Sequence, residues 1–204
     1  MSNITKNKII DYASEKFFRD GYKSIRIDSI ASELSISKST LYKYFKSKDD
    51  LIEYIVKNKI LMINNNMIKI LNDDENKDFI KILNQIWQLI HKHINFFTTQ
   101  VLSDLKSNTP DLFNECQRWD QERKEIFLDV YDLGVEQGYI KPEIDKEIFY
   151  LIHFHSIKNL MQLDVMIQLP LSSEQIIDNI NEVLFKGILT NKGQEKLKIM
   201  FSNN

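Results

Sequence analysis

Residues 34–51 read LSISKSTLYKYFKSKDDL, and this stretch decides the fold of the first part of the chain. Ser37 is a good helix N-cap, so a helix is predicted over residues 38–45. Leu41 and Phe45 lie four residues apart on that helix and are expected to face the core. Ser47 is expected to cap a further helix, in which Asp50 at the third position forms a variant of the capping box.

Two more helices are predicted before this stretch. Apolar residues recur at helical spacing over residues 27–34, and the three residues Ser35-Ile36-Ser37 separate this short helix from the one that follows. Ile10, Ala13 and Phe17 share one face of a first helix over about residues 4–20, which Gly21 ends. Two short helices joined by a three-residue break behind a first helix form a helix-turn-helix unit.

The second short helix is rich in basic, hydroxyl and aromatic side chains. Residues 37–48 hold four lysines and no acid, with hydroxyl and aromatic side chains between them. Such side chains bind phosphate oxygens, and Thr40 and Lys43 are placed to reach base edges. The net charge is +4 over residues 1–60 and −6 over residues 61–204, which favours a polyanion partner at the N-terminal end. The alternative is a solvated basic helix in a bundle that does not bind DNA.

Together with Gly21-Tyr22 and Ile30-Ala31, residues 34–51 resemble the N-terminal signature of TetR-type transcriptional regulators. Pro110-Asp111-Leu112-Phe113 and residues 136–140 are weaker echoes of that family. The chain departs from it in having Ile25-Arg26 where a small hydroxyl residue often caps the second helix; Ser24 or Asp28 could replace that cap. It also has Ser35 where a glycine with positive φ is common.

The resemblance implies a homodimer that binds a roughly palindromic double-stranded DNA operator. The helix-turn-helix units of its two subunits, here called the heads, would lie about one helical turn of DNA apart or somewhat more. The third helix would enter the major groove, Tyr42 and Tyr44 would brace phosphates, and Lys48 would hold another. A small-molecule effector in the C-terminal domain would change the spacing of the heads and weaken operator binding. The candidate DNA-binding residues are Arg26, Ser37, Lys38, Ser39, Thr40, Tyr42, Lys43, Tyr44 and Lys48.

The composition predicts an all-α protein of about nine helices. The 204 residues include 5 Gly, 3 Pro and two Ala, which favours long helices over a β-sandwich or a glycine-rich phosphate-binding enzyme. We expect a DNA-binding domain over 1–47 and a ligand-binding and dimerisation domain over 48–204. Helices are predicted over 48–72, 77–92, 94–107, 110–137, 146–168 and 174–189. A single helix kinked near Asn95 is the alternative for the second and third of them.

The sequence shows no signal for membrane insertion, secretion or metal binding. No apolar run is long enough for a transmembrane helix and no signal peptide is evident, so a cytoplasmic protein without a membrane partner is expected. Cys116 stands alone and forms neither an internal disulfide nor a cysteine-based zinc site. His91/His93 and His153/His155 are spaced i,i+2 on helices, so neither pair chelates by itself, and no metal or cofactor is predicted.

One helix face points to a ligand pocket. Trp119, Arg123 and Phe127 lie at i, i+4 and i+8, so a guanidinium sits among aromatic rings and could meet an anionic ligand. An internal salt bridge or an exposed helix edge is the alternative. The candidate pocket residues are Trp87, His91, Phe97, Trp119, Arg123, Phe127 and His155, although aromatic residues of this kind also serve as plain core.

Apolar stripes on the last two long helices are candidates for the dimer interface that the resemblance implies. The residues are Ile148, Ile152, Ile176, Ile180, Val183 and Leu184, for which an ordinary core role is the alternative. No nucleophile elbow, phosphate loop or zinc motif is present, so an enzyme is not predicted. The prediction is a homodimeric repressor that a small molecule releases from its operator. The rivals are a TetR-like architectural or protein-controlled DNA-binding protein without a small-molecule switch, and a small all-α enzyme with a coincidental basic helix.

Overall fold

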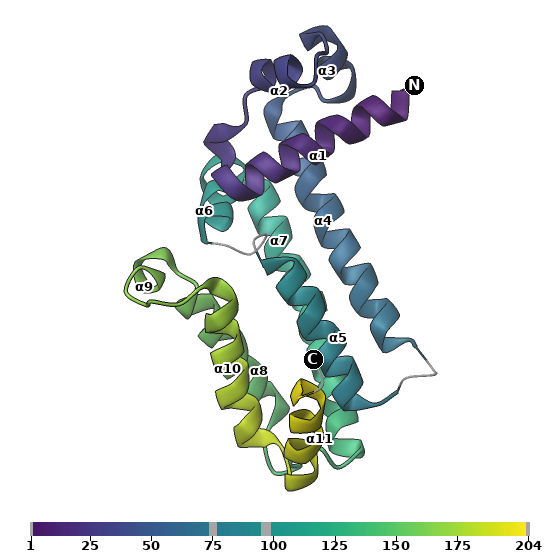
Figure 1. Ribbon diagram of the computed structural model, residues 1–204, viewed down its shortest axis with the longest axis vertical. Helices are drawn as coiled ribbons and strands as arrows, with labels where there is room; N and C mark the ends of the chain where they lie inside the picture. The colour runs from purple at the N-terminus through teal and green to yellow at the C-terminus, as the bar shows by residue number, and fades with distance from the viewer. Residues whose placement is uncertain (1, 74–76, 95–98, 203–204) are drawn as a thin grey trace. The chain divides into compact units, whose positions relative to one another are not determined.

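The computed structural model describes residues 2–73, 77–94 and 99–202 of the chain (Figure 1). Within these residues every regular element is a helix, and the nearest thing to a strand is an isolated bridge between Ile140 and Leu189. The elements are α1 Ser2–Asp20, a 3₁₀ turn η1 Tyr22–Ser24, α2 Ile27–Glu33, α3 Lys38–Tyr44, α4 Lys48–Leu71, α5 Phe79–Lys92, α6 Thr99–Asn108, α7 Pro110–Glu136, α8 Lys146–Leu160, α9 Leu163–Met166, α10 Ser173–Ile188 and α11 Asn191–Ser202. The all-α prediction is confirmed.

Packing divides the described residues into two units. The first holds residues 2–63 and 99–118, and the second holds residues 64–73, 77–94 and 119–202. The helices α4 and α7 each contribute residues to both units. The functional boundary expected after residue 47 stays a prediction.

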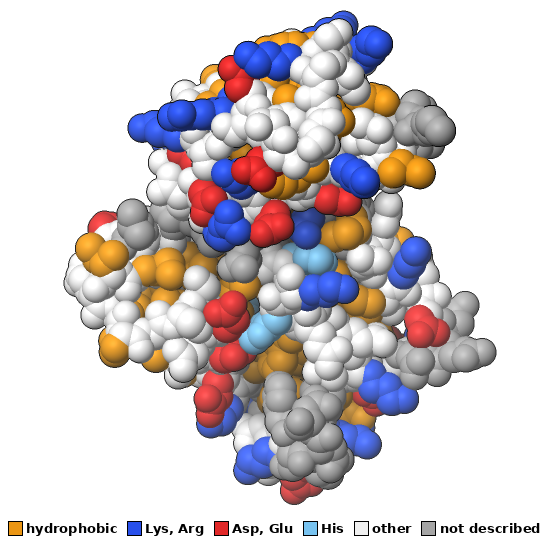
Figure 2. Space-filling view, turned by 45° about the horizontal axis from the view of Figure 1, so that its top comes forward, with side chains coloured by type: hydrophobic (Ala, Val, Ile, Leu, Met, Phe, Trp, Pro, Cys, Tyr) orange, Lys and Arg blue, Asp and Glu red, His pale blue; other side chains and the backbone are white. Residues whose placement is uncertain are grey.

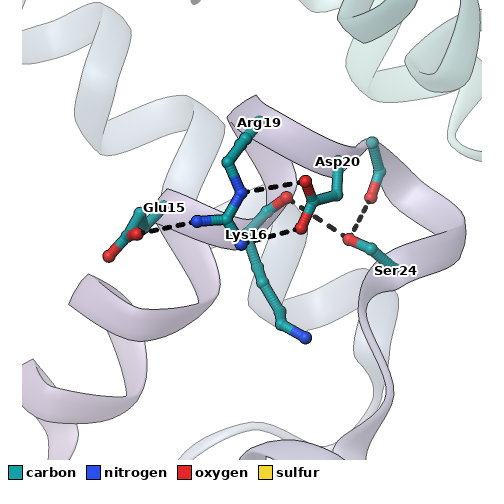
Figure 3. A network of polar contacts seen from close by, with 6 residues as sticks. Glu15, Lys16, Arg19, Asp20 and Ser24 are labelled. Atoms are coloured by element: carbon teal, nitrogen blue, oxygen red, sulfur yellow. Dashed lines mark hydrogen bonds and ion pairs between the residues drawn. The ribbon is translucent and has the colours of Figure 1, made fainter.

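The first helix, α1, buries Ile9, Ala13 and Phe17, which lie four residues apart. Ile10, expected on this face, is only half-buried, because the inward stripe is set by Ile9. At the end of α1, Arg19 pairs with Glu15 at 3.0 Å and with Asp20 at 2.9 Å (Figure 3). These exposed ion pairs add little stability, so α1 is held mainly by its buried stripe.

The turn between α2 and α3 confirms the helix-turn-helix reading. Ser35 has a φ of +52°, the left-handed conformation that the family pattern assigns to this position. The N–H of Ile36 then donates to the carbonyl oxygen of Ala31 at 2.9 Å, which closes the turn. Ala31 is buried in the unit in which α2 packs on α3.

The second unit is built on a core between α5, the second half of α7, α8 and α10. Its largest cluster includes Phe79, Tyr131, Phe149 and Phe185. A smaller cluster contains Met161, Ile176, Ile177 and Ile180. In Figure 1, α8 and α10 lie side by side, in agreement with their packing. Ser172 and Gln175 form a full capping box at the start of α10.

The single long helix predicted over 146–168 is wrong. The helix α8 ends at Leu160, and the chain turns at Met161 before the four-residue helix α9. No glycine or proline marks this break. Burial explains it, because Met161 itself is buried and the later Met166 and Leu169 pack against the same small cluster. The tail after Gly193, left open by the sequence, belongs to α11.

Candidate DNA-binding surface and ligand cavity

The helix α3 is fixed in place by its cap and its buried face. The Ser37 hydroxyl accepts a hydrogen bond from the N–H of Thr40 at 3.0 Å, as an N-cap should. Leu41 and Phe45 are buried, as predicted. One face of the helix is therefore anchored and the other is presented outward.

The outward face carries most of the predicted DNA-binding side chains. Lys38, Ser39, Tyr42 and Lys43 are exposed, and Thr40 and Tyr44 are half-buried beside them. In Figure 2, Lys and Arg side chains project around the top of the view, over the N-terminal helices. A rigid short helix with an exposed row of lysine, hydroxyl and tyrosine groups has the chemistry for phosphate contacts and for reading base edges.

The start of α2 is capped by neither of the two residues that were considered, Ser24 and Asp28. Arg26 occupies the N-cap position, is exposed, and gives no side-chain cap. Ser24 does not replace it, because its hydroxyl donates to the carbonyl oxygens of Gly21 at 2.6 Å and Lys16 at 3.3 Å (Figure 3). Asp28 lies in the first turn and pairs with Lys38 at 2.8 Å. The first turn of α2 thus has no side-chain cap, and Arg26 is left outside it.

Lys48 is positioned by an aromatic ring that sequence reasoning did not assign a role. Its Nζ lies 3.6 Å from the centre of the Tyr22 ring, a close cation–π contact. Burial lowers the pKa of Lys48. The Tyr22 hydroxyl donates to Asp49, and burial followed by this hydrogen bond raises the pKa of Tyr22 to about 12.

Tyr22 is in turn held from α6. Its backbone N–H donates to Oδ2 of Asp104 at 2.7 Å. Gly21 precedes it with a φ of +79°, and a Cβ at this position would lie 2.6 Å from that same carboxylate oxygen. Only glycine therefore allows this approach of the loop to α6. The Gly21-Tyr22 pair was a visible signal, but Asp104 lies 82 residues away and nothing local marked it.

The start of α4 realises the predicted cap with one difference. The Ser47 hydroxyl accepts from the N–H of Asp50 at 3.0 Å. The Asp50 carboxylate accepts from the N–H of Lys46 at 2.7 Å, one residue earlier than a reciprocal capping box requires. Both bonds fix the segment that carries Lys46 and Lys48.

A cavity of about 160 Å³ lies in the second unit, with almost entirely apolar walls. Three of the predicted pocket residues line it: Trp87 from α5, and Arg123 and Phe127 from α7. Phe127 packs its ring against Phe149 and His153, with ring centres 5.7 and 5.2 Å apart. Two of the three residues of the aromatic and cationic face expected on α7, Arg123 and Phe127, thus border this cavity.

Other predicted pocket residues lie elsewhere. His91 pairs with Asp178 at 2.9 Å and does not line the cavity. His155 is exposed, because it lies two residues from the cavity-lining His153 and so projects to a different side of α8. Trp119 is half-buried one turn before Arg123, outside the cavity wall. Phe97 falls outside the described residues.

Among the lining residues that were not predicted are His153 and Asn181, and the sequence held a signal for both. His153 Nε2 and Asn181 Oδ1 are 2.9 Å apart, and burial lowers the pKa of His153. His153 interrupts the apolar series Phe149, His153, Ile157 on α8. Asn181 likewise falls between Ile177 and Phe185 on α10. In each helix a single polar residue interrupts a series of apolar residues spaced four apart. This pattern was the available sign that a polar group faces inward.

The residues predicted for a dimer interface fall into two groups. Ile148 and Ile152 on α8 and Val183 on α10 are exposed, at 56%, 49% and 70%. Ile176 and Ile180 are buried inside the unit, and Leu184 packs against its core, so these three do not form an open surface. Leu151, which was not predicted, joins the exposed residues of α8.

The described residues were also searched for metal-binding side-chain groups and for membrane-spanning helices. The described part of the chain contains no group of three or more His, Cys, Asp or Glu side chains that could hold a metal ion. In the same residues no helix combines the length and the apolar character needed to cross a bilayer.

Comparisons with known proteins agree with the geometry. The model of the family "Bacterial regulatory proteins, tetR family" matches residues 9–55, which span most of α1, all of α2 and α3, and the first turns of α4. The HTH-type transcriptional regulator YvaF of Bacillus subtilis is 24% identical over 81% of this chain and 86% of its own. The HTH-type transcriptional repressor KstR2 of Mycolicibacterium smegmatis is 21% identical over 93% of each chain.

A solved structure extends the likeness to the whole fold. The ketosteroid transcriptional regulator KstR2 of Mycobacterium tuberculosis superposes with a TM-score of 0.64 at 17% identity, covering 92% of this chain and 96% of its own. The sequence relatives are transcriptional regulators and not enzymes. With its helix-turn-helix and its outward-facing α3, the chain carries the DNA-binding domain of the tetR family of bacterial regulatory proteins over residues 9–55 and is a DNA-binding transcriptional regulator.

Proposed function

We propose that this protein is a homodimeric repressor that binds a roughly palindromic operator and is released from it by a small molecule. The observation that carries the proposal is the exposed face of α3, with Lys38, Ser39, Tyr42 and Lys43 presented from a helix that is capped and anchored on its other side. Thr40 and Lys43 are assigned to base edges. Arg26, Ser37, Lys38, Ser39, Tyr42, Tyr44 and Lys48 are assigned to phosphates.

The positive charge of these lysine and arginine side chains determines how DNA affinity depends on salt. Most of the affinity comes from phosphate contacts, and it falls steeply with salt because bound counterions are released. The Tyr22 ring positions the Nζ of Lys48 before DNA binds. A pre-positioned cation loses less conformational entropy on binding than a free one.

The exposed apolar residues of α8 support the homodimer. Ile148, Leu151 and Ile152 lie at i, i+3 and i+4, and together they form one stripe on a helix whose other side packs on α10. With Val183 of α10 they place apolar surface on both helices of the pair. Two such pairs from two protomers bury this surface as a four-helix arrangement. Two protomers present two α3 helices, and this symmetry is the reason for a palindromic operator.

The cavity supports the response to a small molecule. It is concave, mostly apolar and carries few polar groups, which is the usual form of a ligand site. The repressor assignment draws on the KstR2 relative, which is a transcriptional repressor. Because its partner is operator DNA, the protein is placed in the cytoplasm. The alternative, a DNA-binding protein without a small-molecule switch, requires that nothing occupy this cavity.

Selection of genomic DNA tests the proposal. Purified protein is mixed with sheared genomic fragments at low and at moderate salt, and the retained fragments are sequenced. The expected result is one enriched palindrome that survives moderate salt. Sequence-blind retention that disappears with salt would contradict operator recognition and favour an architectural role.

A further inference from the structure

The second unit also carries an open groove with polar walls, formed by one face of α4 and one face of α5. None of its lining residues belongs to the apolar cavity, so the two sites are separate. Both faces follow helical spacing, with α4 residues at i and i+3 and α5 residues at i, i+3 and i+7. The polar residues of the groove are Asn66, Lys69, Gln85, Gln88 and Lys92.

Two positive charges of this groove have no counter-ion. Lys69 and Lys92 are exposed, and neither forms an ion pair or a hydrogen bond within the described part of the chain. No Asp or Glu is among the described residues that line the groove. Elsewhere in the same unit, lysines are paired with carboxylates, as in the pairs of Lys124 with Glu147 and of Lys146 with Asp132. The groove therefore concentrates positive charge that the protein itself leaves uncompensated.

The amide of Gln85 lacks a partner in the wall of this groove. Its Oε1 is buried and accepts no hydrogen bond in the described residues. A buried acceptor without a donor is unfavourable, and the terminal torsion of glutamine is broad enough for the amide to turn toward a bound molecule. A hydroxyl group both donates and accepts, so it serves this amide in either orientation.

The other two amides of the groove extend this polar surface. Asn66 and Gln88 make no hydrogen bond to any described residue. Three amides that are open to a ligand favour a molecule with several hydroxyl groups over an apolar one.

The two lysines favour a phosphate group as the anion. A phosphate monoester carries a charge of about −1.5 to −2 at neutral pH and three acceptor oxygens, which suits two ammonium groups. Lysine binds phosphate as a point charge, whereas planar carboxylates are matched best by the fork of an arginine. No arginine is among the described residues that line the groove.

We propose that the groove between α4 and α5 binds a phosphorylated polyol of the sugar phosphate class. Lys69 and Lys92 bind the phosphate, and the Gln85 amide forms a hydrogen bond with a hydroxyl group of the polyol. This site is additional to the α3 surface and to the apolar cavity, so it goes beyond the proposed function and does not depend on it.

Calorimetric titration of the full-length protein without DNA tests this proposal. The probes are glycerol 3-phosphate, ribose 5-phosphate and glucose 6-phosphate. Inorganic phosphate lacks the polyol, glucose lacks the charge, and gluconate carries a carboxylate in place of the phosphate. We expect at least one of the three phosphorylated probes to bind at least about tenfold more tightly than each of these references.

Substitutions assign the contacts. Lys69→Met and Lys92→Met should each weaken the tightest phosphorylated probe by at least about tenfold, because each removes a charge-assisted contact. Gln85→Leu should weaken the same probe and leave the binding of inorganic phosphate unchanged. The matched control is Lys81→Met, since Lys81 is exposed on the same helix as Lys92 and lies outside the groove. This control should bind the probe like wild type.

Three results would overturn the proposal. The first is that no phosphorylated probe binds more tightly than inorganic phosphate or gluconate. The second is that Lys69→Met or Lys92→Met binds the tightest probe like wild type. The third is that these two variants lose affinity for operator DNA while no phosphorylated probe binds, which would assign the groove to the DNA backbone. Operator selection by the wild-type protein is measured separately, so a failure here leaves the proposed function intact.

Discussion

The backbone N–H of Tyr22 and Oδ2 of Asp104 are joined by a 2.7 Å hydrogen bond that links η1 to α6. The other oxygen of the same carboxylate accepts from Gln100 at 3.0 Å, so Asp104 is held from its own helix as well. The ring of Tyr22 carries the ammonium group of Lys48. The Asp104 carboxylate therefore holds Tyr22 in place, and the Tyr22 ring in turn positions Lys48, a proposed phosphate contact.

Replacing Asp104 with alanine should weaken the first unit and its hold on DNA. The Tyr22 N–H would lose its acceptor in a partly buried position, at a cost of about 1–2 kcal/mol in the free energy of unfolding. Chemical denaturation measures this loss, and operator titration measures the accompanying fall in affinity. Asp104→Asn keeps an acceptor oxygen and should lose less on both measures. Equal loss in the two variants would show that the hydrogen bond is not what matters at this position.

Replacing Ser35 with glycine should stabilise the protein. Ser35 holds a φ of +52°, which is costly for a residue with a Cβ and free for glycine. We expect a gain of about 1 kcal/mol in the free energy of unfolding. Ser156→Gly is the matched control: it lies inside α8 and should lose about 0.5 kcal/mol, because glycine is a poorer helix former than serine. A loss at both positions would contradict the turn geometry.

The Tyr22 hydroxyl should make stability depend on pH in the alkaline range. The pKa of Tyr22 is raised to about 12 in the fold, whereas an unfolded tyrosine titrates near pH 10. The contribution is therefore complete below about pH 10 and is lost as pH rises through about 12. The melting temperatures of wild type and Tyr22→Phe, measured from pH 9 to 12, should converge over this window. A constant difference across the window would rule out the hydrogen bond to Asp49 as its source.

Replacing Ile152 with glutamate should break the proposed dimer. Ile152 is 49% exposed within the apolar stripe of α8, where a partner would desolvate it. A charge there should raise the dimer dissociation constant by at least about tenfold, as at a binding hot spot. Sedimentation velocity across a dilution series measures this change. Leu61→Glu, at a similarly exposed apolar residue of α4, should leave the association unchanged. Identical behaviour of the two variants would place the interface elsewhere.

Local signals predicted the helix-turn-helix well. The Ser37 cap and the inward Leu41 and Phe45 follow from short-range chemistry in one stretch of chain. The left-handed Ser35 was suggested only by the family resemblance, in which a glycine is common at this position. The end of α8 at Leu160 was not legible, because no breaker residue marks it. It depends on how Met161 packs against residues of α10.

The ligand cavity was legible only in part. Trp87, Arg123 and Phe127 could be named from aromatic and cationic spacing, but which of two alternate histidines faces inward depends on how α8 is rotated in the fold. The contact between Asp104 and the Tyr22 backbone joins segments that are distant in sequence. Contacts of this kind depend on how whole helices pack together, so the periodicity within one helix cannot predict them.

The most direct test of DNA recognition through α3 is a fluorescence anisotropy titration at moderate salt. The probes are the selected palindrome and a scrambled duplex of equal length, and the proteins are wild type, Lys43→Ala and the exposed control Lys196→Ala on α11. Wild type and the control should prefer the palindrome by at least about 10³-fold, and Lys43→Ala should lose about 1–3 kcal/mol of that affinity while remaining folded. Equal affinity of wild type for the two duplexes, or an unchanged affinity in Lys43→Ala, would contradict the reading of operator DNA by α3.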